Sequence, residues 1–190
     1  METVLLFHDP PHRLPLKPEL ADLGYAIVAE LDDPRTLHPE VTRLEPGVIV
    51  VTTRTPSREL FGALSAVAES SPRPVVMFAL DANRDVIRRA VDHGVGAYVV
   101  EGWARERLTP IIEAATARFE AYEAMRRELA STRLKLSERK LIEKAKGIVM
   151  EQRKLSEEQA FGALRKMAMD QNLALAEVAR RVISVAELLG

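Results

Sequence analysis

The 190-residue sequence contains no cysteine. This absence excludes a disulfide-stabilised scaffold, a thiol nucleophile and any zinc or iron–sulfur site that uses cysteine ligands. Long hydrophobic runs are also missing, because no stretch approaches the 18 apolar residues that a transmembrane helix needs. The start of the chain has no basic segment before its short apolar run, so no signal peptide is expected. The sequence therefore predicts a cytoplasmic protein without a membrane partner.

An excess of charge of one sign is missing as well, since 27 Lys and Arg nearly balance 28 Asp and Glu. This balance excludes a disordered acidic chain and a histone-like polycation. The near-neutral total nevertheless conceals two unequal halves. Residues 1–103 carry 10 basic and 15 acidic side chains, whereas residues 104–190 carry 17 and 13. The acidic half suits a protein partner, and the basic half suits a nucleic acid.

The first half alternates short apolar runs with amphipathic stretches. Short blocks rich in β-branched residues indicate strands that are buried on both faces of a parallel sheet. These blocks are Val4–Phe7, Val48–Val51, Val75–Ala79 and Ala97–Val100, with a weaker one at Ala26–Ala29. Helix-like segments lie at about 18–23, 58–69, 83–93 and from 104 onward, with a less clear one at Thr36–Leu44. This alternation predicts an α/β fold, namely a five-stranded, parallel, doubly wound domain over residues 1–120.

Residues 104–136 contain no glycine, and their one proline, Pro110, lies near the start. An apolar column recurs every seven residues, at Leu108, Ala115, Tyr122, Leu129 and Leu136. A second column turns basic after its second member, at Ile112, Phe119, Arg126, Arg133 and Lys140. The pattern predicts a long linker helix that leaves the α/β domain as a coiled coil and joins a homodimer. The alternative is one solvated helix with a narrow core stripe.

Residues 137–190 are expected to form a small all-α bundle of three helices. Ser137 is the expected N-cap of the first helix, over 138–152. The sequence Ser156-Glu157-Glu158-Gln159 is a capping box that opens the second, over about 157–170. Its expected inward residues are Ala160, Phe161, Leu164 and either Met167 or Ala168. A third helix over about 174–189 follows the break at Gln171-Asn172 and turns inward Leu175, Val178, Ala179, Val182, Ile183 and Ala186.

Four strand ends in the α/β half carry informative side chains. His8-Asp9 follows the first strand, Thr52 the third, Ala79 ends the fourth and Glu101 follows the fifth. The half resembles a response-regulator receiver domain, in which these places hold an acidic pair, the phospho-accepting aspartate, a hydroxyl residue and a lysine. The resemblance implies that only Asp9 of these functional groups is retained. Tyr98 stands where receivers carry a switch aromatic, although a core position is the simpler interpretation.

These replacements remove the phosphoryl chemistry. Aspartyl phosphorylation needs a carboxylate nucleophile, a Mg²⁺ ion held by several carboxylates, and a cation for the phosphoryl oxygens. Thr52 cannot form an acyl phosphate, and Glu101 would repel a phosphoryl group. We therefore expect a pseudo-receiver with no phosphorylation site, or alternatively another flavodoxin-like domain. No catalytic residue or cofactor is expected. A metal site at His8, Asp9 and His12 is not expected either, because Pro10-Pro11 prevents these residues from lying on one helix face.

The second half carries a more specific set of motifs. They are Leu141-Ile142-Glu143-Lys144-Ala145-Lys146-Gly147-Ile148-Val149-Met150, Leu155–Phe161, Ala163–Met169 and Leu175–Ala179. These motifs resemble the ANTAR domain, an RNA-binding three-helix module of transcription antiterminators, over residues 137–190. With the pseudo-receiver and the coiled coil, the whole chain is similar to the NasT-type regulators of nitrate and nitrite assimilation. That resemblance rests also on Pro74–Ala79 and Tyr98–Gly102.

The resemblance implies a function. ANTAR proteins bind paired stem-loops of a leader mRNA, and this binding prevents an overlapping terminator hairpin from forming. A homodimer joined by the coiled coil would present two modules to two loops. In NasT-type systems a NasS-like nitrate/nitrite sensor protein sequesters the antiterminator and releases it on binding nitrate or nitrite. Control by a protein partner is consistent with a receiver that cannot be phosphorylated.

Six residues are candidate RNA contacts: Lys144, Lys146, Arg165, Lys166, Asn172 and Arg180. Lys146 and Arg165 match motif positions and are favoured, and the alternative for every charged candidate is a solvated surface side chain. Gly147 costs about 1 kcal/mol inside a helix relative to alanine, so we expect it to pack against another helix in preference to RNA. Met167 and Met169 are expected mainly in the core, and the alternative is that one of them faces an RNA base. The competing functions are a DNA-binding response regulator with a helix-turn-helix and a signalling adaptor that binds no nucleic acid.

Overall fold

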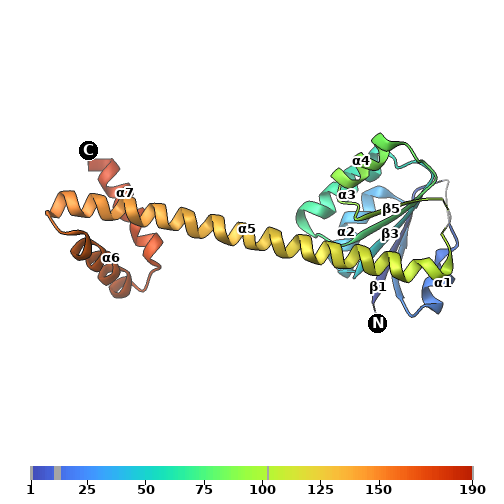
Figure 1. Ribbon diagram of the computed structural model, residues 1–190, viewed down its shortest axis with the longest axis horizontal. Helices are drawn as coiled ribbons and strands as arrows, with labels where there is room; N and C mark the ends of the chain where they lie inside the picture. Colours follow the sequence, from blue (N-terminus) through green and yellow to red (C-terminus); the bar gives the residue numbers. More distant parts are fainter. Residues whose placement is uncertain (1, 11–13, 102, 190) are drawn as a thin grey trace. The chain divides into compact units, whose positions relative to one another are not determined.

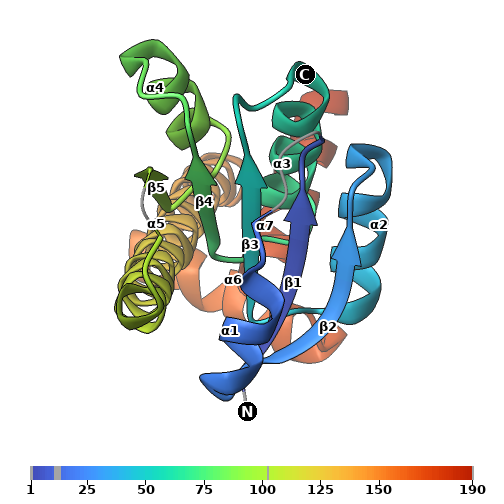
Figure 2. The same ribbon diagram turned by 90° about the vertical axis from the view of Figure 1, so that its right-hand side faces the viewer.

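Five parallel strands form one sheet in the order β2-β1-β3-β4-β5. A computed structural model describes residues 2–10, 14–101 and 103–189 (Figure 1). The strands are β1 (Thr3–His8), β2 (Ala26–Leu31), β3 (Val48–Thr53), β4 (Val75–Ala79) and β5 (Ala97–Val100). Figure 2 shows the arrows of β1, β2, β3 and β4 pointing the same way. The predicted five-stranded, doubly wound sheet is confirmed.

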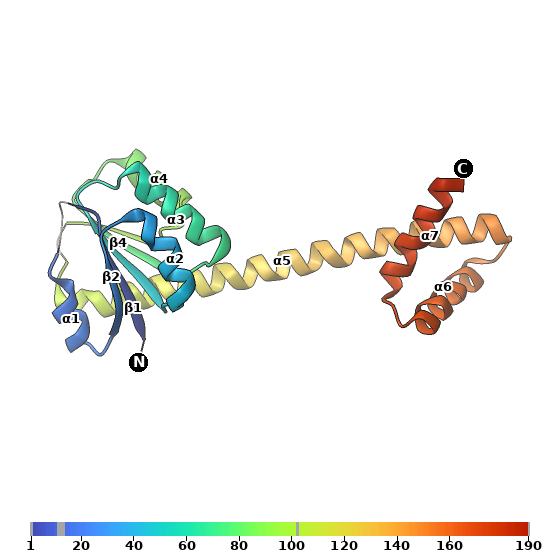
Figure 3. The ribbon, with the colours of Figure 1, turned by 180° about the vertical axis from the view of Figure 1, so that it is seen from behind.

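Helices cover both faces of this sheet (Figure 3). They are α1 (Leu16–Asp22), α2 (Pro34–Leu44), α3 (Arg58–Ser70), α4 (Arg84–Asp92) and the start of α5 (Arg105–Arg153). Alternate side chains of a strand point to opposite faces, so each central strand contributes to two cores. Leu5, Ile49 and Met77 belong to the core under α2, α3 and α4. Val4, Val50 and Phe78 belong to the core under α1 and α5.

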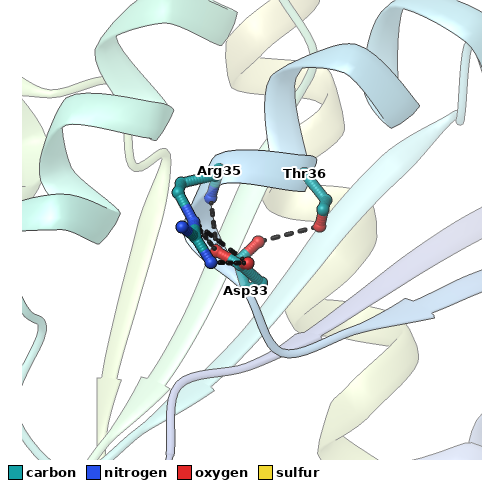
Figure 4. Close-up of polar contacts among 3 residues, drawn as sticks. All are labelled: Asp33, Arg35 and Thr36. Carbon is teal, nitrogen blue, oxygen red and sulfur yellow. Dashed lines mark hydrogen bonds and ion pairs between the residues drawn. The ribbon is translucent and has the colours of Figure 1, made fainter.

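The helix signal at Thr36–Leu44 is confirmed, and α2 begins two residues earlier at Pro34. Asp33 caps it, since its Oδ1 accepts a 2.9 Å hydrogen bond from the backbone N–H of Arg35 (Figure 4). The Arg35 guanidinium also contacts the Asp33 carboxylate at 2.7 Å, and the Thr36 hydroxyl donates to the Asp33 carbonyl oxygen at 2.8 Å. The hydrogen bonds from Arg35 lower the pKa of Asp33. Proline at the first helical position completes this helix start.

The predicted helix start at Ser137 is wrong, because α5 continues through it without a break. Strong helix formers follow Ser137, namely Glu138, Arg139 and Lys140, and no glycine or proline interrupts the chain there. A serine caps a helix only where the backbone turns, so at Ser137 it is one more helical residue. The expected linker helix and the expected first helix of the bundle therefore form one helix over Arg105–Arg153. None of the described helices combines the length and hydrophobicity of a membrane span.

The chain divides into two compact units, Met1–Glu123 and Ala124–Gly190. In the second unit the end of α5 packs with α6 (Glu157–Gln171) and α7 (Leu175–Leu189). The expected capping box is present, since the Ser156 hydroxyl accepts from the Gln159 backbone and the Gln159 side chain accepts from the Ser156 N–H. The core of this unit includes Ala145, Val149, Ala160, Leu164, Val178, Ala179 and Ile183. The predicted apolar face of α7 is thereby confirmed.

Three packing predictions in the second unit are wrong. Phe161 is 38% exposed and Met169 is 76% exposed, although both were expected to face inward. The buried row of α6 is Ala160, Leu164 and Ala168, and Met167 is partly buried against the same core. A Cβ atom added to Gly147 would have no neighbour within 4 Å, so Gly147 does not pack against another helix of the unit. Alanines occupy two of the three buried positions of α6, whereas the larger Phe161 and Met169 lie outside the core.

Candidate nucleic-acid interface and the receiver position

The phospho-acceptor position of the receiver fold is occupied by a buried threonine. Thr52 is fully buried at the end of β3, and its hydroxyl lies 2.8 Å from Nδ1 of His8. His8 Nε2 in turn lies 3.1 Å from Glu30 Oε1, and Lys17 donates to Glu30 Oε2 at 3.1 Å. This chain of contacts joins the carboxyl ends of β3, β1 and β2. The place of the phospho-accepting carboxylate therefore holds a hydroxyl that is already hydrogen-bonded.

The carboxylate of Asp9, the retained acidic residue, is also hydrogen-bonded to neighbouring residues. Its Oδ2 accepts hydrogen bonds from the Thr53 hydroxyl at 2.9 Å and from the Ser57 backbone N–H at 3.2 Å. Ser57 is the N-cap of α3, so Asp9 ties β1 to the start of that helix. Asp9 is 6% exposed. Its carboxylate supports the loop after β3.

Ala79 and Glu101 lie beside a cavity of about 210 Å³ at the carboxyl ends of β4 and β5. The cavity is lined by Leu14, Phe78, Ala79, Leu80, Val99, Glu101 and Trp103. Among the described residues, the lining side chains include no cation and no hydroxyl that would bind phosphoryl oxygens. Tyr98 is half-buried nearby, its hydroxyl donates to the Asp81 carbonyl oxygen at 2.8 Å, and burial raises the pKa of Tyr98 to about 12. The described residues hold no group of three potential metal ligands, and His12 lies outside them.

The two candidate lysines of α5 are paired with carboxylates. Lys144 Nζ lies 2.7 Å from Glu187 Oε1 on α7, and both side chains are exposed. Lys146 is only 9% exposed, and its Nζ lies 2.6 Å from Glu143 and 2.7 Å from Glu157 on α6. The hydrogen bonds to Glu143 and Glu157 raise the pKa of Lys146, and Lys146 lowers the pKa of Glu157. Lys146 therefore links α5 to the first turn of α6.

The other basic candidates carry their charge on the surface. Arg165, Lys166 and Arg180 are exposed, and among the described residues none of them forms an ion pair. Asn172 ends α6 in a left-handed conformation with φ 51°, which asparagine tolerates better than most residues. Its backbone N–H donates to the carbonyl oxygens of Ala168 and Met169. The structure thus assigns Asn172 to the helix end and leaves three unpaired cations.

Sequence reasoning missed the exposed apolar side chains of α6. Phe161, Arg165 and Met169 recur every four residues and form one row of the helix. We name the Phe161 face after Phe161, Gly162, Arg165, Lys166 and Met169, which are all exposed. The sequence did contain a sign of this exposure. Ala160, Leu164 and Ala168 recur every four residues, and a row with two small alanines allows neighbouring helices to pack closely against it. Small side chains in such a row leave the adjacent row outside.

A second exposed apolar row lies on α5. Tyr122 is 65% exposed, Met125 68%, Leu129 51% and Leu136 55%. Their spacings of three, four and seven residues are those of a and d positions in a heptad repeat. Tyr122, Leu129 and Leu136 belong to the first predicted column. Met125 belongs to neither predicted column and lies one residue before Arg126 of the second. Ala115 and Leu108, earlier in the first column, are buried in the α/β core.

Comparisons with known proteins agree with this division of the chain. The ANTAR domain family matches residues 130–183. The transcriptional regulatory protein PdtaR of Mycobacterium tuberculosis (strain H37Rv) is 31% identical over 171 residues, which cover 90% of this chain and 83% of the relative. The nitrate regulatory protein of Klebsiella oxytoca is 52% identical over 61 residues, which cover 32% of this chain and 15% of that protein. Both relatives are named as regulatory proteins.

Solved structures match the α/β unit. The signal receiver domain of a modulated diguanylate cyclase from Desulfovibrio desulfuricans has a TM-score of 0.56 at 18% identity, covering 64% of this chain and 98% of that one. The signal receiver domain of the response regulator NarL from Mycobacterium tuberculosis has a TM-score of 0.51 at 19% identity, covering 63% and 97%. These likenesses show the receiver fold of the first unit.

Proposed function

The chain belongs to the ANTAR-domain transcriptional regulators, and from this premise we propose that it is an RNA-binding transcription antiterminator. It binds paired stem-loops of a leader transcript and thereby prevents a terminator hairpin from forming. Residues 1–120 receive the signal, residues 104–136 join two copies, and residues 137–190 bind RNA. The match of residues 130–183 to the ANTAR family is the observation that carries this proposal.

The surface charges of the second unit support RNA as the ligand. Protein–RNA affinity depends largely on cations that are free to contact phosphates. Arg165, Lys166 and Arg180 are such cations. In the proposal Lys144, Lys146 and Asn172 contribute by holding α5, α6 and α7 together, through the contacts described above. Because only three of the six candidate contacts carry an unpaired charge among the described residues, a single module is expected to bind only modestly.

Two modules in one homodimer raise that affinity. The exposed row Tyr122, Met125, Leu129 and Leu136 supports a coiled-coil seam on α5. Binding of one stem-loop brings the second loop to a high effective concentration beside the second module. The proposal therefore explains why two loops, and not one, form the target. A monomeric helix would leave this apolar row in water.

The degenerate receiver supports control by a protein contact and not by phosphorylation. Thr52 lies buried against His8, and the acidic surface of residues 1–103 suits a protein partner. We assign that partner to the class of NasS-like nitrate/nitrite sensor proteins. The resemblance of the second half to the Klebsiella nitrate regulatory protein supports nitrate and nitrite assimilation genes as the targets. Such a sensor would hold the antiterminator until nitrate or nitrite releases it.

Binding of the full chain to three nucleic acids tests the RNA proposal. Fluorescence anisotropy compares an RNA with two hexaloop stem-loops, the same RNA with one loop closed into a duplex, and a duplex DNA of equal length. We expect the two-loop RNA to bind at least 10-fold more tightly than the other two at physiological salt. A preference for duplex DNA would favour the helix-turn-helix alternative, and no binding would favour the adaptor. Read-through of a terminator in a purified transcription reaction then tests antitermination.

A further inference from the structure

The Phe161 face is not needed for the core of its own unit. The buried α6 residues of the core with α5 and α7 are Ala160, Leu164 and Ala168, each at most 8% exposed, and Met167 packs against this core. Phe161 and Met169 lie outside this core at 38% and 76% exposure. Aromatic and thioether groups kept together on a surface indicate an interaction site more than a stability requirement.

The cations of the face have no carboxylate partner among the described residues. Lys144, Lys146 and Arg181 each lie within 3.5 Å of a carboxylate. Arg165 and Lys166 have no such neighbour among residues 124–189, whose side chains are described to residue 187. Carboxylates flank the face at the two ends of α6, at Glu158 and at Asp170. Positive charge is thereby confined to the middle of the helix, beside the ring of Phe161.

Gly162 leaves room on the same face. A Cβ atom at this position would have no neighbour within 4 Å, so no packing contact in the unit requires glycine. Glycine inside a helix costs about 1 kcal/mol relative to alanine. Its position beside Phe161, and one turn before Arg165 and Lys166, opens the helix surface to a flat ligand. Gly162 itself adds no side chain beside the ring of Phe161.

These features together suit an unpaired nucleotide. A base has a planar face that stacks on an aromatic ring, and its phosphates require nearby cations. A second copy of the chain suits the face less well, because a two-fold contact centred on it would bring Arg165 against Arg165. The loops of a stem-loop RNA are the unpaired bases that the proposed function supplies. Charge complementarity thus favours RNA over a second copy.

We propose that Phe161 stacks on an unpaired loop base of the bound RNA, with Met169 beside the base and Arg165 and Lys166 on its phosphates. This inference rests on the proposed RNA-binding function and adds the residue that reads the loop. The ring contributes stacking and no charge. Arg165 contributes charge, and its loss changes the salt dependence of binding. The two contributions can therefore be measured separately.

The test uses the full chain and a two-loop RNA in which 2-aminopurine replaces each loop base in turn. We expect Phe161→Leu to weaken binding about 10-fold, which corresponds to about 1.4 kcal/mol, with an unchanged dependence on salt. Phe161→Trp should keep the native affinity, because it restores a stacking ring. Arg165→Gln should lower the slope of log affinity against log salt by about one per module. One loop position should show 2-aminopurine quenching that Phe161→Leu removes at saturating protein.

Val185→Ala is the matched control, since Val185 is 54% exposed on α7 outside the Phe161 face and should bind RNA like the native chain. Native affinity and native quenching in Phe161→Leu would overturn the stacking inference and leave RNA binding intact. A weaker dimer in Phe161→Leu, measured by sedimentation equilibrium without RNA, would assign the face to a second copy. Failure of the native chain to bind the RNA would instead overturn the proposed function.

Discussion

At the scale of single residues, the clearest result is that the receiver position has become a structural contact. Thr52 and His8 are both buried, and the 2.8 Å contact between them replaces the ionised groups of a phosphorylation site. A buried polar atom that loses its partner costs about 1–3 kcal/mol. The polar groups that remain at this edge of the sheet therefore stabilise the fold.

Replacing Thr52 with valine tests this interpretation. Thr52→Val keeps the volume of the side chain and removes the hydroxyl that meets His8 Nδ1. We expect the free energy of unfolding of the first unit to fall by about 1–2 kcal/mol, measured by urea titration. RNA affinity should not change, because the second unit is untouched. Unchanged stability would contradict a structural role for the Thr52–His8 contact.

Lys146 is the candidate RNA contact with two carboxylate partners. Its motif position suggests an RNA contact, but it lies 2.7 Å from Glu157 and links α5 to the start of α6. Glu157→Gln removes this charge and leaves Lys146 in place. We expect faster amide hydrogen exchange at the start of α6 at pH 7, with RNA affinity reduced less than in Arg165→Gln. An RNA defect in Glu157→Gln as large as that of Arg165→Gln would contradict this assignment.

The pH dependence of that link has a definite sign. The pKa of Glu157 is lowered from 4.5 by Lys146, so its stabilising contribution is complete above that value and is lost as pH falls through the folded-state pKa. The pKa of Lys146 is raised from 10.5, so its contribution disappears only as pH rises beyond that value. The difference in exchange between Glu157→Gln and the native chain should therefore be present at pH 7 and shrink as the pH falls from 4.5 through the folded-state pKa of Glu157. A difference that persists at low pH would exclude the ion pair as its cause.

At the scale of elements, α5 carries the proposed dimer seam, and one substitution distinguishes it from a solvated helix. Leu129 lies on the exposed row with Tyr122 and Leu136, whereas Leu134 is equally apolar and 55% exposed but lies off the row. We expect Leu129→Lys to weaken dimerisation at least 10-fold in sedimentation equilibrium and to reduce the advantage of two-loop over one-loop RNA. Leu134→Lys is the matched control. Equal behaviour of the two variants would show that this row is not the seam.

The same elements show how far sequence reasoning reaches. Strands such as Val48–Thr53 were predicted because a buried parallel strand is apolar without interruption, and the capping box at Ser156 fixes the start of α6 locally. Ser137 misled because its capping ability depends on a turn that the neighbouring residues do not make. Phe161 misled because which row of α6 is buried depends on the alanines of the facing helices. The two errors share a cause, because both positions depend on structure beyond the local motif.

The candidate RNA-binding residues also show the difference between local properties and contacts between helices. The sequence identified the cations of the second half, because motif positions and charge are local properties. It did not separate Lys144 and Lys146 from Arg165, Lys166 and Arg180, since the carboxylates that pair with the two lysines include Glu157 and Glu187 on other helices. Ion pairing across helices is a tertiary property. The structure therefore narrows the proposed phosphate contacts to three residues.

At the scale of the whole molecule, the near-neutral net charge is the sum of an acidic α/β half and a basic helical half. Phosphorylation of a receiver needs a carboxylate acceptor, a Mg²⁺ site and a cation, and the corresponding positions hold Thr52, Asp9 in protein hydrogen bonds, and Glu101. In the proposed function the signal therefore enters by another route. A protein that contacts the acidic half provides one.

Treatment with acetyl phosphate and Mg²⁺ tests this route on the intact chain. We expect no phosphoryl group to be added, as measured by intact mass, and no change in affinity for the two-loop RNA. A receiver domain with a complete acidic site, treated in parallel, controls for the reagent. The appearance of an aspartyl phosphate would contradict the pseudo-receiver interpretation, and a linked change in RNA affinity would restore phosphorylation as the signal. If neither occurs, a partner protein captured from cells grown without nitrate should be released by adding nitrate or nitrite, because control by contact requires a partner whose affinity depends on the inducer.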